Sequence, residues 1–336
     1  MIVIAHRGAS GERPEHTLES YRLAIEEGAD YIEPDLVMTR DGVLIARHEN
    51  EIGGTTNVAE HPEFAARRRT QVIDGESLTG WFTEDFSLSE IKSLRARERL
   101  PDLRPQNTRF DGLFGVPTFD EIMQLVMSVN ASSSANGSPG ASVAPSANRR
   151  IGVYPETKHP AHFAAIGLPL ELSLLDTLRR YDYAKHGSPV FIQSFDSRNL
   201  KQLRAMTPLP LVQLLEREPV NLQEIAGHAD AIGIAKTLAT AERIQAAHGA
   251  KLLVHAWTFR AENEFLPADL KRGTEPAAHG DLAAEITRYL NRGIDGFFVD
   301  FPALGVAARD AYSSAAQPLH QPATETSLPG NKSHGR

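Results

Sequence analysis

The feature that most constrains the fold is a series of short apolar runs, repeated along most of the chain and bounded by turn-forming residues. Several runs are followed by segments with helical periodicity, so strand and helix patterns alternate. Short runs of this kind are typical of buried parallel strands, and their alternation with helices predicts an α/β fold. The runs are Ile2–Ala5, Tyr31–Leu36, Val43–Ala46, Ile151–Tyr154, Val190–Ile192, Leu211–Leu215, Ala231–Ile234, Leu252–Val254 and Gly296–Val299.

An alternating pattern fits two architectures, an open doubly wound sheet and a closed (β/α)8 barrel. The chain has no glycine-rich dinucleotide fingerprint, which nucleotide-binding doubly wound sheets carry after their first strand. Its 336 residues also accommodate the roughly 250-residue core of a barrel. The sequence therefore predicts an α/β fold of the (β/α)8 TIM barrel type.

Nine runs are one too many for eight strands, and a hairpin explains the extra one. Asp41-Gly42 lies between two apolar arms, and Asp-Gly favours a two-residue turn because both central residues need a positive φ. Such a turn makes the Val43–Ala46 run antiparallel to its neighbour and leaves eight parallel strands. In this register His48 lies opposite Asp35 on the same face of the sheet.

Capping residues mark several expected helix starts. Thr17 precedes a helical pattern that Gly28 can end. The segments Ser87-Leu88-Ser89-Glu90 and Thr118-Phe119-Asp120-Glu121 match the capping box, in which a hydroxyl and a carboxylate satisfy two backbone N–H groups reciprocally. These signals predict helices that begin directly after Thr17, Ser87 and Thr118.

Two segments lack any apolar period. Residues 131–148 contain only Ala, Ser, Asn, Gly and Pro apart from Val143, which predicts a flexible loop. Residues 313–336 are rich in Ser, Ala, Pro, Thr and Gln, which predicts a disordered tail. Because the strand patterns on both sides of the loop belong to one architecture, we expect residues 1–312 to form a single domain.

Composition excludes several classes of protein. The formal charge of −8 disfavours a nucleic-acid binder, and the absence of cysteine excludes disulfides and thiolate metal sites. No run approaches the about 20 apolar residues that span a bilayer. The first residues do not form a secretory signal, so we expect a cytoplasmic protein, or a periplasmic or secreted one if the chain is a processed form. The sequence does not indicate an oligomeric state.

Chemically active side chains gather where predicted strands end. The carboxyl ends of barrel strands meet at one mouth, where active sites are built. Taken singly, each of these residues has an ordinary structural explanation, such as an ion pair between Lys158 and Glu156. The set comprises two histidines, three carboxylates and two cations: His6, Arg7, Glu33, Asp35, His48, Glu156 and Lys158.

Taken together, these residues favour cleavage of a phosphodiester. Three crowded carboxylates repel one another, and a hard divalent cation with oxygen ligands offsets that repulsion. Two histidines can then serve as general base and general acid, while the arginine and the lysine hold a phosphate. Phe195 and Trp257 end later strands and are candidates for the pocket wall, although core packing explains Trp257 equally well.

At these residues the sequence resembles the glycerophosphodiester phosphodiesterase family, in its bacterial periplasmic-type branch. The opening segment is the most specific, and all the matching segments follow the family order. They are Ala5-His6-Arg7-Gly8-Ala9-Ser10, Pro14-Glu15-His16-Thr17, Glu33-Pro34-Asp35-Leu36, Thr39-Arg40-Asp41-Gly42, His48-Glu49, Glu156-Thr157-Lys158, Gln193-Ser194-Phe195, Ala256-Trp257-Thr258 and Asp295-Gly296-Phe297-Phe298-Val299-Asp300.

The resemblance implies a metal-dependent (β/α)8 barrel that hydrolyses glycerophosphodiesters, such as deacylated phospholipids, to glycerol 3-phosphate and an alcohol. It implies a small insertion after the second strand region, at about residues 50–115. It also implies roles for single residues: metal ligands for one Ca²⁺ or Mg²⁺ at Glu33, Asp35 and Glu156, the general acid/base pair at His6 and His48, and phosphate contacts at Arg7 and Lys158.

Three other functions compete with this one. A lysophospholipase D-like phosphodiesterase on the same barrel would need a long apolar groove. A non-catalytic phosphodiester-binding barrel would be expected to have lost a histidine or a metal carboxylate, and all the matched positions are intact. A nuclease is disfavoured by the negative net charge. The expected partner is therefore a small-molecule glycerophosphodiester, with no nucleic acid.

Overall fold

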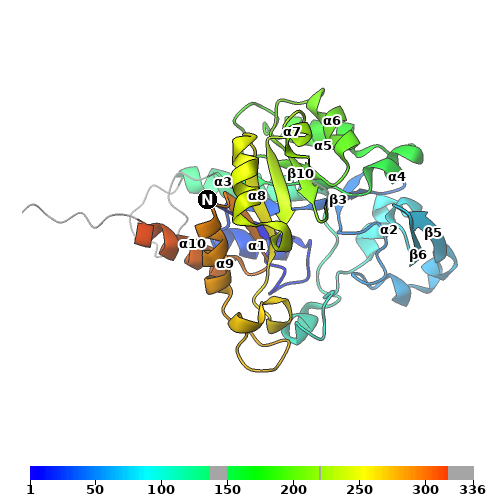
Figure 1. Ribbon diagram of the computed structural model, residues 1–336. Helices are drawn as coiled ribbons and strands as arrows, with labels where there is room; N and C mark the ends of the chain where they lie inside the picture. The colour runs from blue at the N-terminus through cyan, green and yellow to red at the C-terminus, as the bar shows by residue number, and fades with distance from the viewer. Residues whose placement is uncertain (136–149, 219–220, 317–336) are drawn as a thin grey trace, which may run out of the picture.

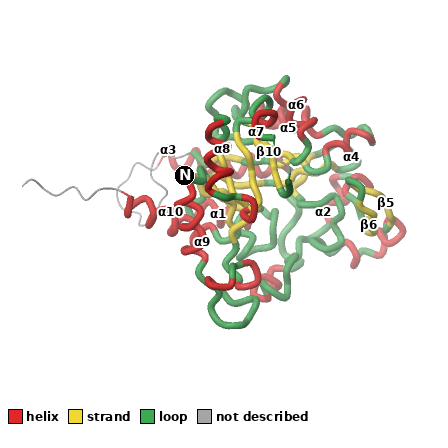
Figure 2. Tube along the Cα trace, in the orientation of Figure 1, coloured by secondary structure: helices red, strands yellow, loops and turns green. Residues whose placement is uncertain are grey.

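The centre of the protein is an eleven-stranded sheet surrounded by helices (Figures 1 and 2). The computed structural model describes residues 1–135, 150–218 and 221–316. The strands of the central sheet are β1 (Ile2–His6), β2 (Tyr31–Glu33), β3 (Asp35–Met38), β4 (Leu44–Ala46), β7 (Gly152–Val153), β8 (Glu156–Thr157), β9 (Ile192–Ser194), β10 (Leu211–Leu215), β11 (Ala231–Ala235), β12 (Leu253–Phe259) and β13 (Gly296–Val299).

Two pairs of these strands are continuous extended segments interrupted at a proline. Pro34 separates β2 from β3, and Pro155 lies between β7 and β8, because proline has no N–H to donate to the sheet. Counted in this way, eight parallel segments pair in chain order, and β13 pairs in turn with β1. The curled sheet gives the α/β, TIM-barrel-like fold that was predicted.

The hairpin prediction is right in direction and wrong in register. β4 is antiparallel to β3, but Arg47, not His48, lies opposite Asp35, with its N–H donating to the Asp35 carbonyl at 2.9 Å. The turn has three residues, because Thr39 N–H donates to the Val43 carbonyl at 3.0 Å. Only Gly42 needs a positive φ, at 79°, as in a hairpin with a glycine bulge.

The capping signals are confirmed. The Thr17 hydroxyl accepts from the Ser20 N–H at the start of α1, and Gly28, with φ 90°, follows its end. Both capping boxes are present at the starts of α2 and α3. The helices are α1 (Leu18–Glu26), α2 (Leu88–Ser93), α3 (Phe119–Ala135), α4 (Pro160–Ala165), α5 (Leu170–Arg180), α6 (Ser197–Arg204), α7 (Leu222–Ile225), α8 (Ala241–Gly249), α9 (Leu282–Arg292) and α10 (Pro302–Ala316).

The chain between β4 and α3 leaves the alternating pattern. It contains an antiparallel hairpin of β5 (Arg69–Ile73) and β6 (Glu76–Gly80), the short helix α2 and several 3-10 turns. Figure 1 shows this hairpin at the right-hand side of the molecule. The insertion expected at about residues 50–115 falls in this stretch.

Both segments expected to be irregular begin with helix. Residues 131–135 belong to α3, and residues 313–316 belong to α10, where the Ser313 hydroxyl donates to the Arg309 carbonyl at 2.9 Å. Ala and Ser can continue a helix once it is nucleated. The prediction from composition therefore placed the start of the loop and the start of the tail a few residues too early. The remainder of both segments lies outside the described residues. No helix in the described ranges is long and apolar enough to cross a membrane.

Candidate active site

Side chains alternate in direction along each barrel strand, and this two-residue period positions the residues of the site. A small apolar cluster fills the barrel interior, and it includes Ile4, Tyr154 and Phe298, with Tyr31 and Phe191 packed against it. Side chains two residues apart on a strand point the same way. One step further toward the carboxyl end of each strand come His6, Glu33, Glu156, Gln193 and Asp300. The strands therefore carry apolar packing inside the barrel and chemically active groups at its mouth.

A cavity of about 100 Å³ lies at this mouth. Eight of the nine side chains named from the sequence line it: His6, Arg7, Glu33, Asp35, His48, Glu156, Phe195 and Trp257. The ninth, Lys158, lines an adjoining groove. Phe195 and Trp257 meet edge to face, with ring centroids 5.9 Å apart, and together form one wall of the cavity.

The three carboxylates form a compact buried cluster. Oxygens of Glu33, Asp35 and Glu156 lie within 4.8 Å of one another, and each residue is at most 6% exposed. Burial and the neighbouring Asp35 carboxylate raise the pKa of Glu33 well above its usual value and that of Glu156 to about 8. One buried oxygen, Asp35 Oδ1, has no hydrogen-bond partner among the described residues. Such a set is suited to a cation with oxygen ligands.

Two cations lie beside this cluster. Arg7 Nε is 3.4 Å from Asp35 Oδ2, and Lys158 Nζ is 3.0 Å from Glu156 Oε1. Burial would lower the pKa of Lys158, but the attraction of Glu156 and Asp35 outweighs it and raises that pKa. A divalent cation would hold all three carboxyl groups in their ionised form, and the three carboxylates, the two basic side chains and the ion would together carry one excess positive charge.

The turn at Arg7 explains the His-Arg-Gly sequence that ends β1. The backbone reverses there, with φ of 60° at Arg7 and 86° at Gly8, and the Arg7 N–H donates to Glu33 Oε2 at 2.8 Å. A side chain at Gly8 would collide with Ser20, since an added Cβ would lie 2.4 Å from its hydroxyl oxygen. Glycine is therefore required where the chain turns the arginine back into the cavity.

The two histidines have different surroundings. His6 Nδ1 is 2.6 Å from the buried carboxylate of Asp300. His48 Nδ1 is 2.7 Å from Glu49, whose side chain is 41% exposed. Burial and the nearby Arg7 charge lower the pKa of His6 to about 4 and that of His48 to about 3, so both imidazoles are neutral near pH 7.

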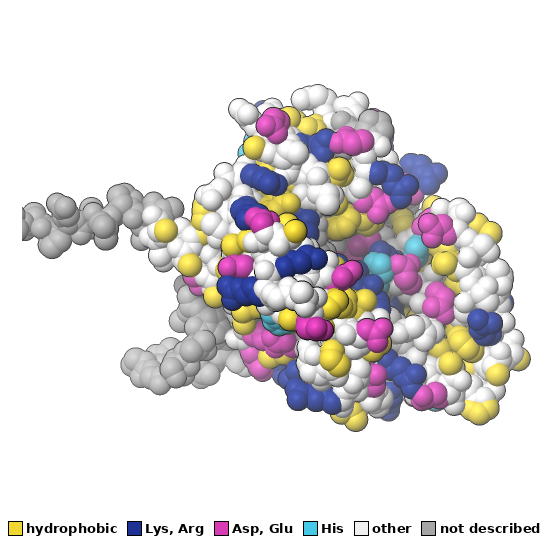
Figure 3. All heavy atoms as spheres, turned by 60° about the horizontal axis from the view of Figure 1, so that its bottom comes forward, with side chains coloured by type: hydrophobic (Ala, Val, Ile, Leu, Met, Phe, Trp, Pro, Cys, Tyr) yellow, Lys and Arg dark blue, Asp and Glu magenta, His cyan; other side chains and the backbone are white. Residues whose placement is uncertain are grey.

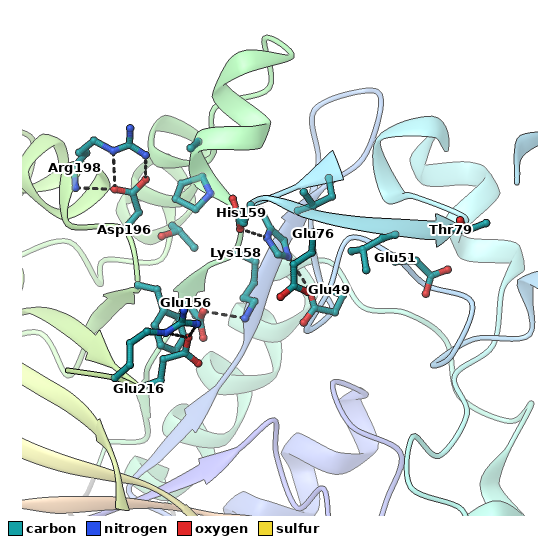
Figure 4. A pocket seen from close by; sticks show the side chains of 18 residues that line it. Glu49, Glu51, Glu76, Thr79, Glu156, Lys158, His159, Asp196, Arg198 and Glu216 are labelled. Carbon is teal, nitrogen blue, oxygen red and sulfur yellow. Dashed lines mark hydrogen bonds and ion pairs between the residues drawn. The ribbon is translucent and has the colours of Figure 1, made fainter. Parts of the chain in front are cut away.

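A groove of about 770 Å³ adjoins the cavity and shares Glu156 and Phe195 with it. In Figure 3 the surface is hollowed beside the lobe at the right of the view, and histidine and acidic side chains gather there. The groove runs along the β5–β6 hairpin, and Figure 4 shows His159 and Glu49 directed toward each other across it. His159 bonds Glu49 at 2.8 Å and Asp74, in the hairpin turn, at 2.6 Å. His159 thus ties the hairpin to the loop that carries His48.

Comparison with known proteins decides the family. A family model described as the glycerophosphoryl diester phosphodiesterase family matches residues 6–304. The chain belongs to this family. A glycerophosphodiester phosphodiesterase of Arabidopsis thaliana is 34% identical, with 89% of this chain and 83% of the relative aligned. Another, from Haemophilus influenzae, is 29% identical over 91% of this chain and 88% of the relative. The enzyme class predicted from the sequence, a phosphoric diester hydrolase, is confirmed.

Solved structures support the fold. A glycerophosphoryl diester phosphodiesterase from Silicibacter pomeroyi superimposes with a TM-score of 0.67 at 22% identity, covering 93% of this chain and 94% of the other. A phosphodiesterase from Oleispira antarctica, in complex with its product sn-glycerol-3-phosphate, gives a TM-score of 0.63 at 20% identity, with 92% and 97% covered. At these identities the likeness concerns the fold.

Several site residues in this family member were assigned no role from sequence. Gln193 donates to Glu33 at 2.8 Å, and His16 bonds Asp35 at 2.9 Å. Glu15 accepts from Arg7 at 2.9 Å, and Asp300 contacts His6. Gln193 and Asp300 follow the strand-end rule that picked out His6, so that rule could have found them. Nothing in the local pattern around Glu15 and His16 shows that the loop before α1 folds back over the mouth.

Proposed function

We propose that this chain hydrolyses glycerophosphodiesters to glycerol 3-phosphate and an alcohol, with the help of one divalent cation. The observation that carries the proposal is the buried Glu33–Asp35–Glu156 cluster, which shares one cavity with His6 and His48. Support comes from the names of the Arabidopsis and Haemophilus relatives and from the glycerol 3-phosphate bound by the Oleispira enzyme.

The donor set fits a hard cation. All three candidate ligands are carboxylates. Two buried oxygens beside them, Asp35 Oδ1 and the Gln193 amide oxygen, have no hydrogen-bond partner among the described residues. Oxygen ligands of this kind suit Ca²⁺ or Mg²⁺. Such an ion would supply positive charge for the phosphodiester oxygens and for the charge that develops during cleavage.

The chain's own residues account for binding and proton transfer. Arg7 and Lys158 contribute positive charge on either side of the carboxylate cluster and hold the phosphate. One histidine takes a proton from the attacking oxygen as the new P–O bond forms, and the other protonates the departing alkoxide. A bound phosphodiester brings negative charge next to both imidazoles, which raises their pKa and favours the protonated form of the proton donor.

The adjoining groove favours a small polar alcohol over a long acyl chain. Its walls carry many charged side chains, including Glu49, Glu51, Asp74, Glu76, Asp196 and Glu216. A lysophospholipase D-like enzyme would have to bury a hydrocarbon chain against these groups, which is costly because the charges would lose their hydration. We infer that the alcohol half of the substrate lies in this groove while the glycerol 3-phosphate half remains in the cavity.

The test is release of glycerol 3-phosphate by the purified chain from diesters with cationic, neutral and anionic alcohols. We expect EDTA to reduce release at least ~100-fold and added Ca²⁺ or Mg²⁺ to restore it. Titration calorimetry provides a readout besides activity: Asp35→Asn should weaken binding of the restoring ion. Activity that is insensitive to EDTA would contradict the cation, and no release from any diester would contradict the substrate class.

A further inference from the structure

His6, at the end of β1, is hydrogen-bonded by Asp300, the residue that directly follows β13. Phe298 lies in the barrel interior, so Asp300, two residues further on, points toward the mouth. Its Oδ1 is 2.6 Å from His6 Nδ1, and Asp300 is 1% exposed. The sequence places these residues almost three hundred positions apart, and the pairing of β1 with β13 brings them together.

Asp300 is itself held by two arginines. Arg260 Nε donates to Asp300 Oδ2 at 2.9 Å, and Arg104 donates to the same oxygen. Arg104 also donates to Glu262 at 2.6 Å and to the Ser10 carbonyl at 2.9 Å. Burial would raise the pKa of Asp300, but the charges of Arg104 and Arg260 outweigh burial and hold that pKa well below its usual value.

An ionised Asp300 determines which nitrogen of His6 carries the proton. A carboxylate only accepts hydrogen bonds, so Nδ1 must be the donor in this pair. Nε2 then keeps a free lone pair, and within the described ranges no protein group bonds it. Because His6 lines the cavity, this nitrogen is available to a substrate.

We propose that Asp300 is a positioning residue that fixes the Nδ1–H tautomer of His6 and makes Nε2 the proton acceptor of the reaction. The inference rests on the proposed function. As the attacking oxygen bonds to phosphorus, its proton moves to His6 Nε2, and the P–O bond to the alcohol breaks. The departing alkoxide takes its proton from His48 in the imidazolium form, which the negative charge of the bound phosphodiester favours. Asp300 stabilises the His6 imidazolium and does not take the proton, since two arginines keep it ionised.

The kinetic test compares Asp300→Asn with a matched substitution at the other end of the same strand. Asp295 precedes β13 and also contacts a histidine, His248, at 2.9 Å, but outside the cavity. We expect Asp300→Asn to lower kcat at least ~100-fold with little change in KM, because the asparagine amide can donate to Nδ1 and select the wrong tautomer. Asp295→Asn should leave kcat unchanged, and Asp300→Glu should retain more activity than the asparagine variant.

A spectroscopic readout separates this inference from the substrate assignment. In ¹⁵N-histidine NMR spectra of the full chain, assigned with His6→Gln, neutral His6 should carry its proton on Nδ1. In Asp300→Asn the proton should move to Nε2, while Asp295→Asn keeps the original tautomer. An unchanged His6 tautomer in Asp300→Asn would overturn the proposal, whatever the substrate is. A kcat within ~3-fold of the unmodified enzyme would overturn it as well. If the unmodified chain releases no glycerol 3-phosphate, the tautomer shift still decides the positioning role.

Discussion

The surroundings of the two cavity histidines differ in burial and in the groups that hold them. On one side, His6 contacts Asp300, and Arg104 and Arg260 hold Asp300 in turn. On the other side, His48 contacts the partly exposed Glu49, which bonds the titratable His159. We call these the His6 side and the His48 side.

The difference shows how a single active-site opening can have one histidine in fixed surroundings and another in surroundings that change with conditions. Arginine stays charged at all physiological pH values, so the His6 side keeps its geometry as conditions change. The His48 side is held by His159, whose charge changes with pH, and by Asp74 in a hairpin turn beside the groove. We therefore expect activity to require both sides and stability to depend chiefly on the His6 side.

The largest expected effect is common to both sides. His6→Ala and His48→Ala should each lower turnover of a glycerophosphodiester by about 10²–10⁴-fold, the usual range for loss of a general acid or base. The measurement is glycerol 3-phosphate release, with circular dichroism to show that each variant folds. Near-normal turnover in either variant would contradict the role of that histidine.

Stability should separate the two sides. Arg104→Met leaves the buried Glu262 carboxylate without its arginine partner and leaves Arg260 as the remaining arginine on the buried Asp300 carboxylate. We expect a loss of about 3–5 kcal/mol in the free energy of unfolding, measured by urea denaturation. A loss below ~1 kcal/mol would show that the interactions of the His6 side stabilise the fold no more than those of the His48 side do.

The pH dependence of stability should have opposite signs for His6 and for His159. The pKa of His6 is lowered to about 4, so between pH 6.5 and 4 the unfolded chain binds more protons and stability falls as the pH falls. The His6 share is on the order of 3 kcal/mol. His6→Gln should therefore flatten the acid side of the stability profile of EDTA-treated protein.

His159 should act in the other direction. Burial would lower its pKa, but the bonds to Glu49 and Asp74 outweigh burial and raise it. Its contribution to stability is complete below pH 6.5 and is lost as the pH rises through the folded pKa. His159→Gln should flatten the neutral-to-alkaline side of the same profile. The same change of slope in both variants would contradict the opposite signs expected for His6 and His159.

The smallest effect is expected at the hairpin turn. Asp74→Asn breaks the ion pair with His159, but the Asp74 side chain is 56% exposed, and exposed ion pairs contribute less than about 1 kcal/mol. Urea denaturation should therefore show a loss below that value. A larger loss would mean that the hairpin contributes to global stability as strongly as the His6 side does.

Much of the fold could be predicted because parallel barrel strands leave a simple signature. Every predicted apolar run overlaps or directly adjoins a strand, since buried strands need apolar side chains on both faces. The hairpin register could not be predicted, because Asp-Gly fits both a two-residue turn and a three-residue turn. The choice is made by Asp41, which accepts hydrogen bonds from Thr39 and from the Leu88 N–H. Leu88 lies 47 residues away in the chain.

By itself the sequence determined which side chains reach the mouth, because the two-residue period of a strand is a local property. That period selects His6, Glu33 and Glu156, one step beyond the apolar interior. Only the tertiary structure decided which groups hold them. Asp300 reaches His6 from a distant part of the chain, and Arg104 bonds Asp300 in turn. The burial of His6 lowers its pKa, and we propose that Asp300 sets its tautomer. Burial and long-range pairing are properties of the folded chain, so no local pattern encodes them.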